Sequence, residues 1–239
     1  PIREIIDEEK TAQREMLLND GDMSFISSDD EDWRWIDDYA QGKIPIGLDT
    51  GDPMLDEHFR YKKEFVIING HSNVGKTTFT LWLMVAASML HGWKWLVYSA
   101  ENPTWANKMK VMQFCMDMPI KRMNHKELTT AHDWVNKHFT FIDNHKNYSY
   151  SDILVFAEKV LKYEGLDGVL IDPYNALRID MSAHRGISTH EYHYEAASEF
   201  LTFSVKNQVA MWVNAHAFTE AQRRKGDDGL PTAPYAEDT

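Results

Sequence analysis

A glycine-containing segment at residues 70–78 carries the strongest chemical signal in the sequence. It matches the pattern G-x-x-x-x-G-K-[ST], follows a short β-branched and aromatic run, and precedes an apolar segment with helical character. In such a loop, backbone N–H groups surround phosphate oxygens, and the next helix directs its positive N-terminus at them. The segment predicts a binding site for a nucleoside triphosphate, taken to be ATP, formed by Gly70, His71, Ser72, Asn73, Val74, Gly75, Lys76, Thr77 and Thr78.

Three side chains are expected to act on the triphosphate and its magnesium ion. The amine of Lys76 can reach the β- and γ-phosphates, and the hydroxyl of Thr77 can bind Mg²⁺. Asp172 directly follows the apolar run Val-Leu-Ile and fits the acidic residue that holds Mg²⁺ directly or through water. An aspartate before Pro173 could instead only cap a turn, but the loop upstream favours the metal role.

Two further polar residues end strand-like patterns and fit a hydrolysis site. Glu101 follows the run at 93–98, where a carboxylate can act as general base on the attacking water. Its alternative is an acid that only stabilises the N-terminus of the next helix. His216 ends the run at 209–215, where an imidazole can bind the γ-phosphate; its alternative is an ordinary core histidine. We expect Lys76, Glu101 and His216 to form the catalytic group.

The pattern of elements that must position these residues predicts an α/β fold. Short apolar runs alternate with helical patterns, which is typical of crossover units in a mostly parallel sheet with helices on both faces. In such folds the ligand lies at the carboxyl ends of the strands, so the polar strand-end residues should converge there. The strand-like runs are 65–68, 93–98, 139–142, 169–171 and 209–215. The helical patterns include 77–91, which Gly92 ends, 150–163, which Ser151 caps, and 191–207.

The N-terminal part differs in composition from the rest. Residues 2–18 suggest an amphipathic helix, and residues 19–38 form an acidic arm, so we divide the chain into residues 1–43 and an ATPase domain at 44–239. The net charge is −12, but residues 1–40 hold 13 acidic and 4 basic residues, which leaves only −3 for the other 199. Nucleic acid therefore remains an admissible partner for the main domain.

Other sequence features limit the setting of the protein. The apolar run near residues 81–90 is too short to span a bilayer, residues 1–18 are charged throughout, unlike a signal peptide, and no membrane partner is expected. The single cysteine, Cys115, suits a reducing compartment. We expect a protein of the cytoplasm of a bacterium or a phage-infected cell, with an organelle as the alternative.

The motif series resembles that of the RecA-type replicative helicases, a family that includes DnaB, the mitochondrial helicase Twinkle and the phage primase-helicases. The matching segments are Gly-His-Ser-Asn-Val-Gly-Lys-Thr-Thr, Ser-Ala-Glu-Asn, Leu-Ile-Asp-Pro-Tyr-Asn and Asn-Ala-His, and the likeness covers about residues 44–225. The resemblance implies a RecA-like core in a homo-oligomeric ring, expected to be hexameric, with ATP between subunits and single-stranded DNA in the channel. It also implies that Glu101 is the base, Asp172 the Mg²⁺ ligand and His216 the γ-phosphate sensor. Residues 2–18 then resemble a linker helix that docks on the next subunit.

The same resemblance directs attention to two loops and to a missing group. Basic side chains in the loops after the fourth and fifth strand-like runs are the candidates for DNA contact, although a solvated charged loop is the alternative for each. The arginine finger of the family is expected beyond Thr239, because the basic residues of the second loop lie too close to the sensor. The candidates are Arg178, His184 and Arg185 in the first loop and Arg223, Arg224 and Lys225 in the second.

Two alternative functions remain open at this level. A RecA- or RadA-like recombination ATPase would share the core but assemble as filaments, and a KaiC-like protein would use hydrolysis to regulate an assembly. His190 and His193 could share a helix face, but the segment does not match the H-E-x-x-H zinc pattern and no third ligand is in register.

Overall fold

The computed structural model describes residues 30–43, 46–180, 188–217 and 225. The chain divides into two units, residues 1–46 and residues 47–239. In the first unit, α2 spans Asp30–Ala40 and exposes the side chains of Trp33, Trp35, Ile36 and Tyr39. Part of the segment interpreted as an acidic arm is helical, because its apolar residues recur at helical spacing. The predicted helix at 2–18 lies outside the described residues.

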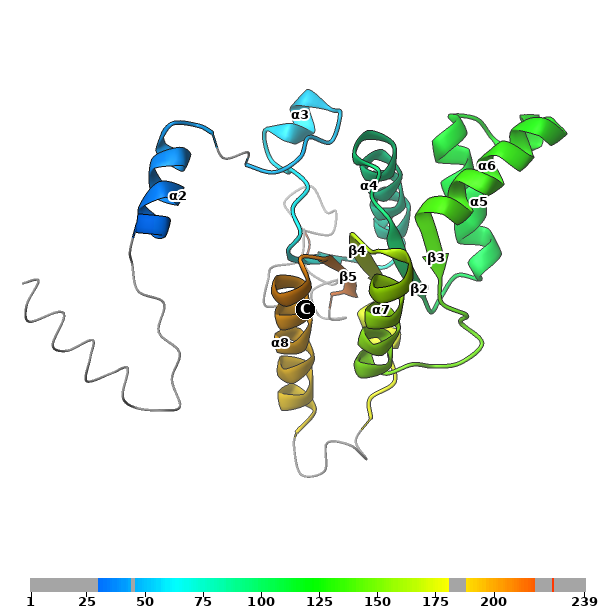
Figure 1. The fold of residues 1–239 in the computed structure, drawn as a ribbon. Coiled ribbons are helices and arrows are strands. Elements are labelled where there is room, and N and C mark those ends of the chain that lie inside the picture. The colour runs from blue at the N-terminus through cyan, green and yellow to red at the C-terminus, as the bar shows by residue number, and fades with distance from the viewer. Residues whose placement is uncertain (1–29, 44–45, 181–187, 218–224, 226–239) are drawn as a thin grey trace, which may run out of the picture. The chain divides into compact units, whose positions relative to one another are not determined.

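The second unit is built on a five-stranded parallel sheet with the order β1-β5-β4-β2-β3. This confirms the predicted α/β fold with a parallel sheet between helices (Figure 1). The strand register places the expected site residues at the same end of the sheet. Gly70 of β1 is opposite His216 of β5, and Ser99 of β2 is opposite Asp172 of β4. The strands are Phe65–Gly70 (β1), Trp95–Ser99 (β2), Phe139–Phe141 (β3), Gly168–Asp172 (β4) and Ala210–His216 (β5).

Alternate side chains of each central strand enter one of two apolar cores. On β2, Trp95 and Val97 belong to the core under helix α4 (Lys76–His91). Leu96 and Tyr98 belong to the core under helices α7 (Tyr150–Glu164) and α8 (Thr189–Asn207). Because β2, β4 and β5 are covered on both faces, they read as continuous apolar runs rather than as an alternating pattern. Burial of both faces fixes the register of the strands that carry the site.

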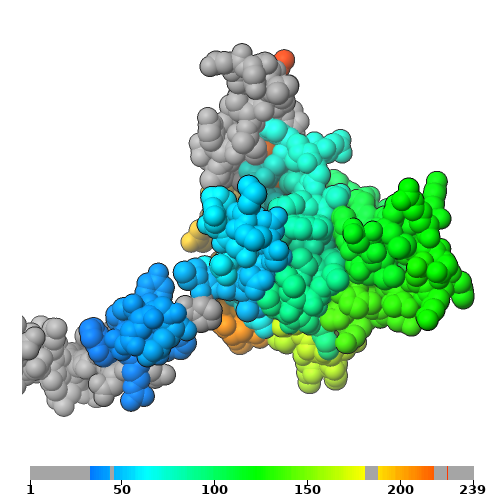
Figure 2. Space-filling view, turned by 90° about the horizontal axis from the view of Figure 1, so that it is seen from above, coloured from blue at the N-terminus to red at the C-terminus, as the bar shows by residue number. Residues whose placement is uncertain are grey.

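Helices α4, α5 and α6 cover one face of the sheet (Figure 1). Helix α4 spans Lys76–His91 and begins after Gly75, whose φ of 94° lies in the left-handed region; it ends at Gly92, as the sequence predicted. Helix α5 (Thr104–Met116) follows Pro103, and α6 (His125–His138) is capped reciprocally by Asn124 and Glu127. In the space-filling view these two helices form one continuous side of the unit (Figure 2). Short helices that the sequence analysis did not predict are α3 (Pro53–Asp56) and the 3₁₀ turn η1 (Ile120–Arg122).

Helices α7 and α8 cover the other face (Figure 1). Helix α7 spans Tyr150–Glu164, and its cap is Ser149 rather than the predicted Ser151, because Ser149 and Asp152 close a capping box. Helix α8 spans Thr189–Asn207 and begins two residues earlier than predicted, because Ser188 and Glu191 also form a capping box. The 3₁₀ turn η2 (Tyr174–Ala176) follows β4 directly and begins the loop toward α8.

Candidate nucleotide site

The glycine-containing loop joins β1 to α4 at the carboxyl edge of the sheet. Asn73 and Gly75 both have positive φ, 62° and 94°, so the chain turns sharply before the helix begins at Lys76. Gly70 allows a close approach, because a Cβ there would lie 3.2 Å from Cδ of Lys76. A tight loop that leads directly into a helix is the arrangement in which backbone N–H groups bind phosphate oxygens.

Lys76 and Glu101 lie on either side of His216. Nζ of Lys76 donates to the carbonyl oxygens of Gly70 and His71 at 2.7 and 2.8 Å and lies 3.2 Å from Nδ1 of His216. On the other side of the ring, Nε2 of His216 is 3.1 Å from Oε1 of Glu101. The structure thus brings together the three residues that the sequence analysis assigned to catalysis.

The contacts of His216 define its tautomer. An ammonium group only donates hydrogen bonds, so Nδ1 must accept from Lys76. The proton of the neutral ring is then on Nε2, which donates to the carboxylate of Glu101. Burial lowers the pKa of Lys76, while the carboxylates of Asp172 and Glu101 oppose this shift by favouring its charged form.

Asp172 ends β4 and is almost completely buried. Its Oδ2 accepts from Oγ1 of Thr77 at 2.8 Å, and its Oδ1 accepts from Nδ2 of Asn214 at 2.7 Å. Oδ1 of Asn214 in turn accepts from Oγ1 of Thr80 at 3.1 Å. The predicted pair Thr77 and Asp172 is therefore adjacent, within a buried polar network that joins β4, β5 and α4.

A second asparagine reaches the site from η2. Oδ1 of Asn175 accepts from the backbone N–H of His216 at 2.7 Å. This bond ties the turn after β4 to the last residue of β5. Sequence reasoning assigned no role to Asn175 or Asn214, although both belong to the quoted motif segments, because the partners of an amide cannot be deduced from its spacing in the sequence.

The residues present fit a nucleotide with magnesium. Thr77 and Asp172 offer hydroxyl and carboxylate oxygens, the hard ligands that Mg²⁺ prefers, next to the phosphate cradle. Lys76 places a positive charge at the same edge. When bound, Mg²⁺ would neutralise phosphate charge, with Thr77 and Asp172 as its protein ligands.

The predicted DNA contacts are only partly described. Arg178 follows η2 and forms an ion pair with Asp152 at 3.2 Å, so part of its charge is neutralised within the protein. Lys225 is exposed. His184, Arg185, Arg223 and Arg224 lie outside the described residues.

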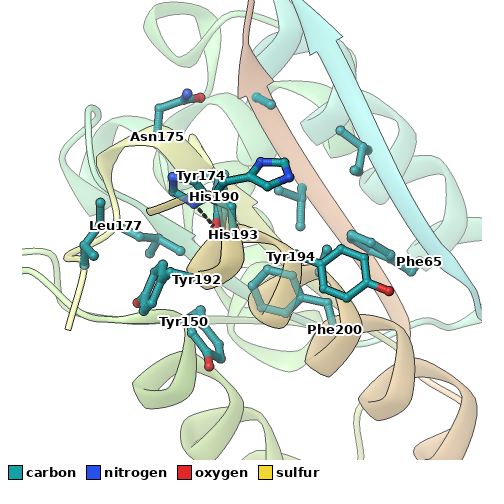
Figure 3. A pocket seen from close by; sticks show the side chains of 15 residues that line it. Phe65, Tyr150, Tyr174, Asn175, Leu177, His190, Tyr192, His193, Tyr194 and Phe200 are labelled. Atoms are coloured by element: carbon teal, nitrogen blue, oxygen red, sulfur yellow. Dashed lines mark hydrogen bonds between the residues drawn. The ribbon is translucent and has the colours of Figure 1, made fainter. Parts of the chain in front are cut away.

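An aromatic pocket of about 440 Å³ lies on the opposite side of β5 from α4 (Figure 3). Phe65 and Phe200 pack at 5.9 Å between ring centroids, and His190 and Tyr194 of α8 also line the pocket. Nδ1 of His193 and the hydroxyl of Tyr174 form a hydrogen bond of 2.7 Å, shown as a dashed line. Burial, followed by the proximity of His190, lowers the pKa of His193, and burial raises the pKa of Tyr174, so both groups are neutral near pH 7.

The structure also bears on the zinc site considered for His190 and His193. Within the described residues, no group of three histidine, cysteine or acidic side chains could hold a metal ion. His193 is engaged with Tyr174 instead. The same part of the chain contains no helix with the length and apolar character needed to cross a membrane.

Comparisons with known proteins show which proteins this chain is similar to in sequence and fold. The Arabidopsis thaliana protein "Twinkle homolog protein, chloroplastic/mitochondrial" is 24% identical over 197 residues, covering 77% of this chain. The chain spans only 27% of the length of that relative. A solved structure of an ATPase domain has a TM-score of 0.68 at 16% identity, and the match covers 90% of this chain and 78% of that one.

A second solved structure carries the same fold. It is described as "The Structure Of A DnaB-Like Replicative Helicase And Its Interactions With Primase", with a TM-score of 0.65 at 16% identity, covering 97% of this chain and 59% of that one. These likenesses confirm the predicted RecA-like P-loop fold. A family model for an AAA domain matches residues 52–217, which begin at the N-cap of α3 and end just after His216. Because this match covers more than half of the chain and includes the loop, Glu101, Asp172 and His216, the chain belongs to the AAA domain family.

Proposed function

We propose that this chain is the ATP-hydrolysing motor core of a replicative DNA helicase that translocates on single-stranded DNA as a homohexameric ring. The observation that carries the proposal is the hydrogen-bonded group Lys76–His216–Glu101 beside the pair Thr77 and Asp172. The names of the similar proteins, a Twinkle homologue and a DnaB-like replicative helicase, support the choice among ATPases of this fold.

In this proposal, each side chain has a distinct task in hydrolysis. Lys76 binds the β- and γ-phosphate oxygens, and Thr77 and Asp172 hold the magnesium ion. Glu101 accepts the proton of the attacking water, for which its position beyond the end of β2 is suited. Release of the bond to His216 leaves Oε1 of Glu101 available to that water.

The link from hydrolysis to movement is proposed to run through His216. This residue ends β5, and Lys225 lies nine residues further along the chain. Asn175 ties it to the turn that precedes Arg178. A shift of the imidazole toward the γ-phosphate would therefore be transmitted to both loops expected to contact DNA.

The single-stranded DNA partner and the ring are part of the same proposal. Basic side chains in these loops would bind backbone phosphates without sequence preference and with strong salt dependence. The location would be the cytoplasm of a bacterium or a phage-infected cell, with an organelle as the alternative suggested by the name of the plant relative.

The test is ATP hydrolysis by the full-length protein with and without single-stranded DNA. We expect stimulation by single-stranded DNA that declines as salt is raised. Absence of stimulation would contradict a DNA motor and favour the KaiC-like alternative. Negative-stain images with a non-hydrolysable ATP analogue would then separate a closed ring from the filament expected of a recombination ATPase.

A further inference from the structure

We propose that Asn214 is a positioning residue for the magnesium-binding carboxylate, which it holds with Oδ2 directed at Thr77. The inference rests on the proposed nucleotide-hydrolysing function and gives a role to Asn214, the first residue of the Asn-Ala-His segment, to which the sequence analysis assigned none. Its basis is the contact of 2.7 Å between Nδ2 of Asn214 and Oδ1 of Asp172, next to the 2.8 Å contact between Oδ2 and Oγ1 of Thr77.

The orientation of the Asn214 amide follows from its partners. A buried carboxylate oxygen can only accept, so the NH₂ group and not the carbonyl must face Asp172. The carbonyl then faces α4, where Oγ1 of Thr80 lies at 3.1 Å. Thr80 also lies 2.9 Å from the carbonyl oxygen of Lys76, so its hydroxyl has a second acceptor within reach.

The burial of Asn214 indicates that a polar side chain at this position has a specific role. Its side chain is fully buried, in a central strand, between the apolar residues Val213 and Ala215. Burying an amide costs free energy unless its hydrogen bonds are made, and an aliphatic side chain would pack there without that cost. The bonds of Asn214 go to the carboxylate of Asp172 and to the helix that begins at the phosphate loop.

Holding one oxygen of Asp172 determines what the other can do. The terminal torsion of an aspartate is broad, so the plane of its carboxylate is set by its partners. With Oδ1 held by Asn214, Oδ2 faces Thr77, and both oxygens expected at the magnesium ion are oriented together. Partners of this kind typically change metal affinity by roughly 10- to 100-fold when they are removed.

Substitutions at position 214 can remove the NH₂ donor that faces Asp172 while keeping a side chain of similar shape. Asn214→Leu keeps a similar volume but leaves Oδ1 of Asp172 without this donor. We expect the magnesium concentration needed for half-maximal tightening of a fluorescent ATP analogue to rise by about tenfold, while affinity in EDTA stays unchanged. Asn214→Asp places a second carboxyl group against Asp172, and the shift should then be at least as large.

Thr80→Val is the matched control, because it removes a buried hydroxyl from the same cluster but keeps the donor that faces Asp172. Its magnesium midpoint should stay within about twofold of the unsubstituted protein, well below the effect of losing the metal partner. If Asn214→Leu fails to fold by circular dichroism, the pair Asn214→Thr and Asn214→Val replaces it. These two side chains have nearly the same shape, and only the threonine can donate, so it should retain the lower magnesium midpoint.

The outcomes are distinguishable. Equal magnesium midpoints for the unsubstituted protein and Asn214→Leu, or for the Thr and Val variants, would overturn the inference and leave the proposed function intact. A shift with Thr80→Val as large as with Asn214→Leu would also overturn it, since the effect would then belong to the cluster as a whole. Failure of the unsubstituted protein to bind the ATP analogue would instead contradict the proposed function itself.

Discussion

The Nε2–H group of His216 donates to Oε1 of Glu101 at 3.1 Å, although 115 residues separate them in the chain. The expected sensor and the expected general base thus share one hydrogen bond. A base held in this way is oriented, but one of its lone pairs is occupied. Movement of His216 toward a phosphate would lengthen the bond and free the carboxylate for a water molecule.

Glu101→Gln should leave ATP binding intact and reduce the rate of phosphate release by about 10²- to 10⁴-fold, the usual range for loss of a general base. The amide retains the size of the carboxylate but does not accept a proton. Glu158→Gln, an exposed acid on α7, is the matched control and should hydrolyse ATP normally. Turnover by Glu101→Gln at the unsubstituted rate would remove Glu101 as the base.

His216→Gln and His216→Ala should differ in how hydrolysis responds to DNA. Glutamine can still hydrogen-bond a phosphate and Lys76, so stimulation by single-stranded DNA should persist, whereas alanine offers no such group. We expect His216→Ala to lose about tenfold or more in the ratio of stimulated to basal rates, as expected when one charge-assisted hydrogen bond of about 1.5–3 kcal/mol is removed. Equal ratios for the two variants would show that the imidazole position carries no signal.

Asn175→Ala should weaken the connection between η2 and β5. The variant loses the acceptor of the His216 backbone N–H, a bond whose net contribution to stability is about 1 kcal/mol. Asn175→Asp keeps an acceptor oxygen at the same place and serves as the control. Urea denaturation should show the loss for alanine but not for aspartate, and stimulation by DNA should follow the same order.

The cap of α7 predicts a pH dependence of stability. The backbone N–H of Ser149 lowers the pKa of Asp152 most strongly, with further lowering by the Ser149 hydroxyl and Arg178 against an opposing effect of burial. A lowered folded-state pKa stabilises the protein above the ordinary value of 3.8, and this contribution is lost as pH falls through the folded-state value. Asp152→Asn should therefore be less stable than the unsubstituted protein at pH 7, and the difference should shrink below pH 3.8. A difference that stays constant with pH would contradict the charge-dependent cap.

Gly168→Ala tests the packing at the start of β4. A Cβ at this position would lie 2.2 Å from the ring of Trp95, which is itself buried, so the sheet would have to shift. We expect a loss of about 3 kcal/mol in the free energy of unfolding, at the upper end of the range for overpacked cores. Gly92→Ala, where φ is 73° and the surrounding space is open, should cost only about 1 kcal/mol through its left-handed backbone. Equal losses for the two variants would rule out the contact with Trp95 as the cause.

The sequence could predict the strands and the site residues that share a recognisable spacing. Lys76, Thr77 and Asp172 belong to patterns whose chemistry requires those residue types, and Glu101 and His216 are recognised by their place at strand ends. The parallel sheet then brings them together because the carboxyl ends of its strands meet at one edge.

The amides and caps could not be predicted in the same way. Asn214 and Asn175 become informative only once β4 and β5 are known to be neighbours, since their partners lie 42 and 41 residues away in the chain. The cap of α7 was assigned to Ser151 because several adjacent residues could begin that helix; reciprocal bonds between Ser149 and Asp152 select the earlier start. The contacts of the two amides are not local in the sequence, and the local sequence leaves open which of the adjacent residues caps the helix.

The alternation of side chains along β5 limits the insertions and deletions that this strand can accept. Asn214 and His216 face the phosphate loop and α4, while Val213 and Ala215 line the aromatic pocket on the other side. Insertion or deletion of a single residue within the strand would exchange these two sets, placing aliphatic groups beside Asp172 and an imidazole among the rings of Phe65 and Phe200. Homologous proteins that keep this site should therefore vary in length before Ala210 but never by one residue between Ala210 and His216.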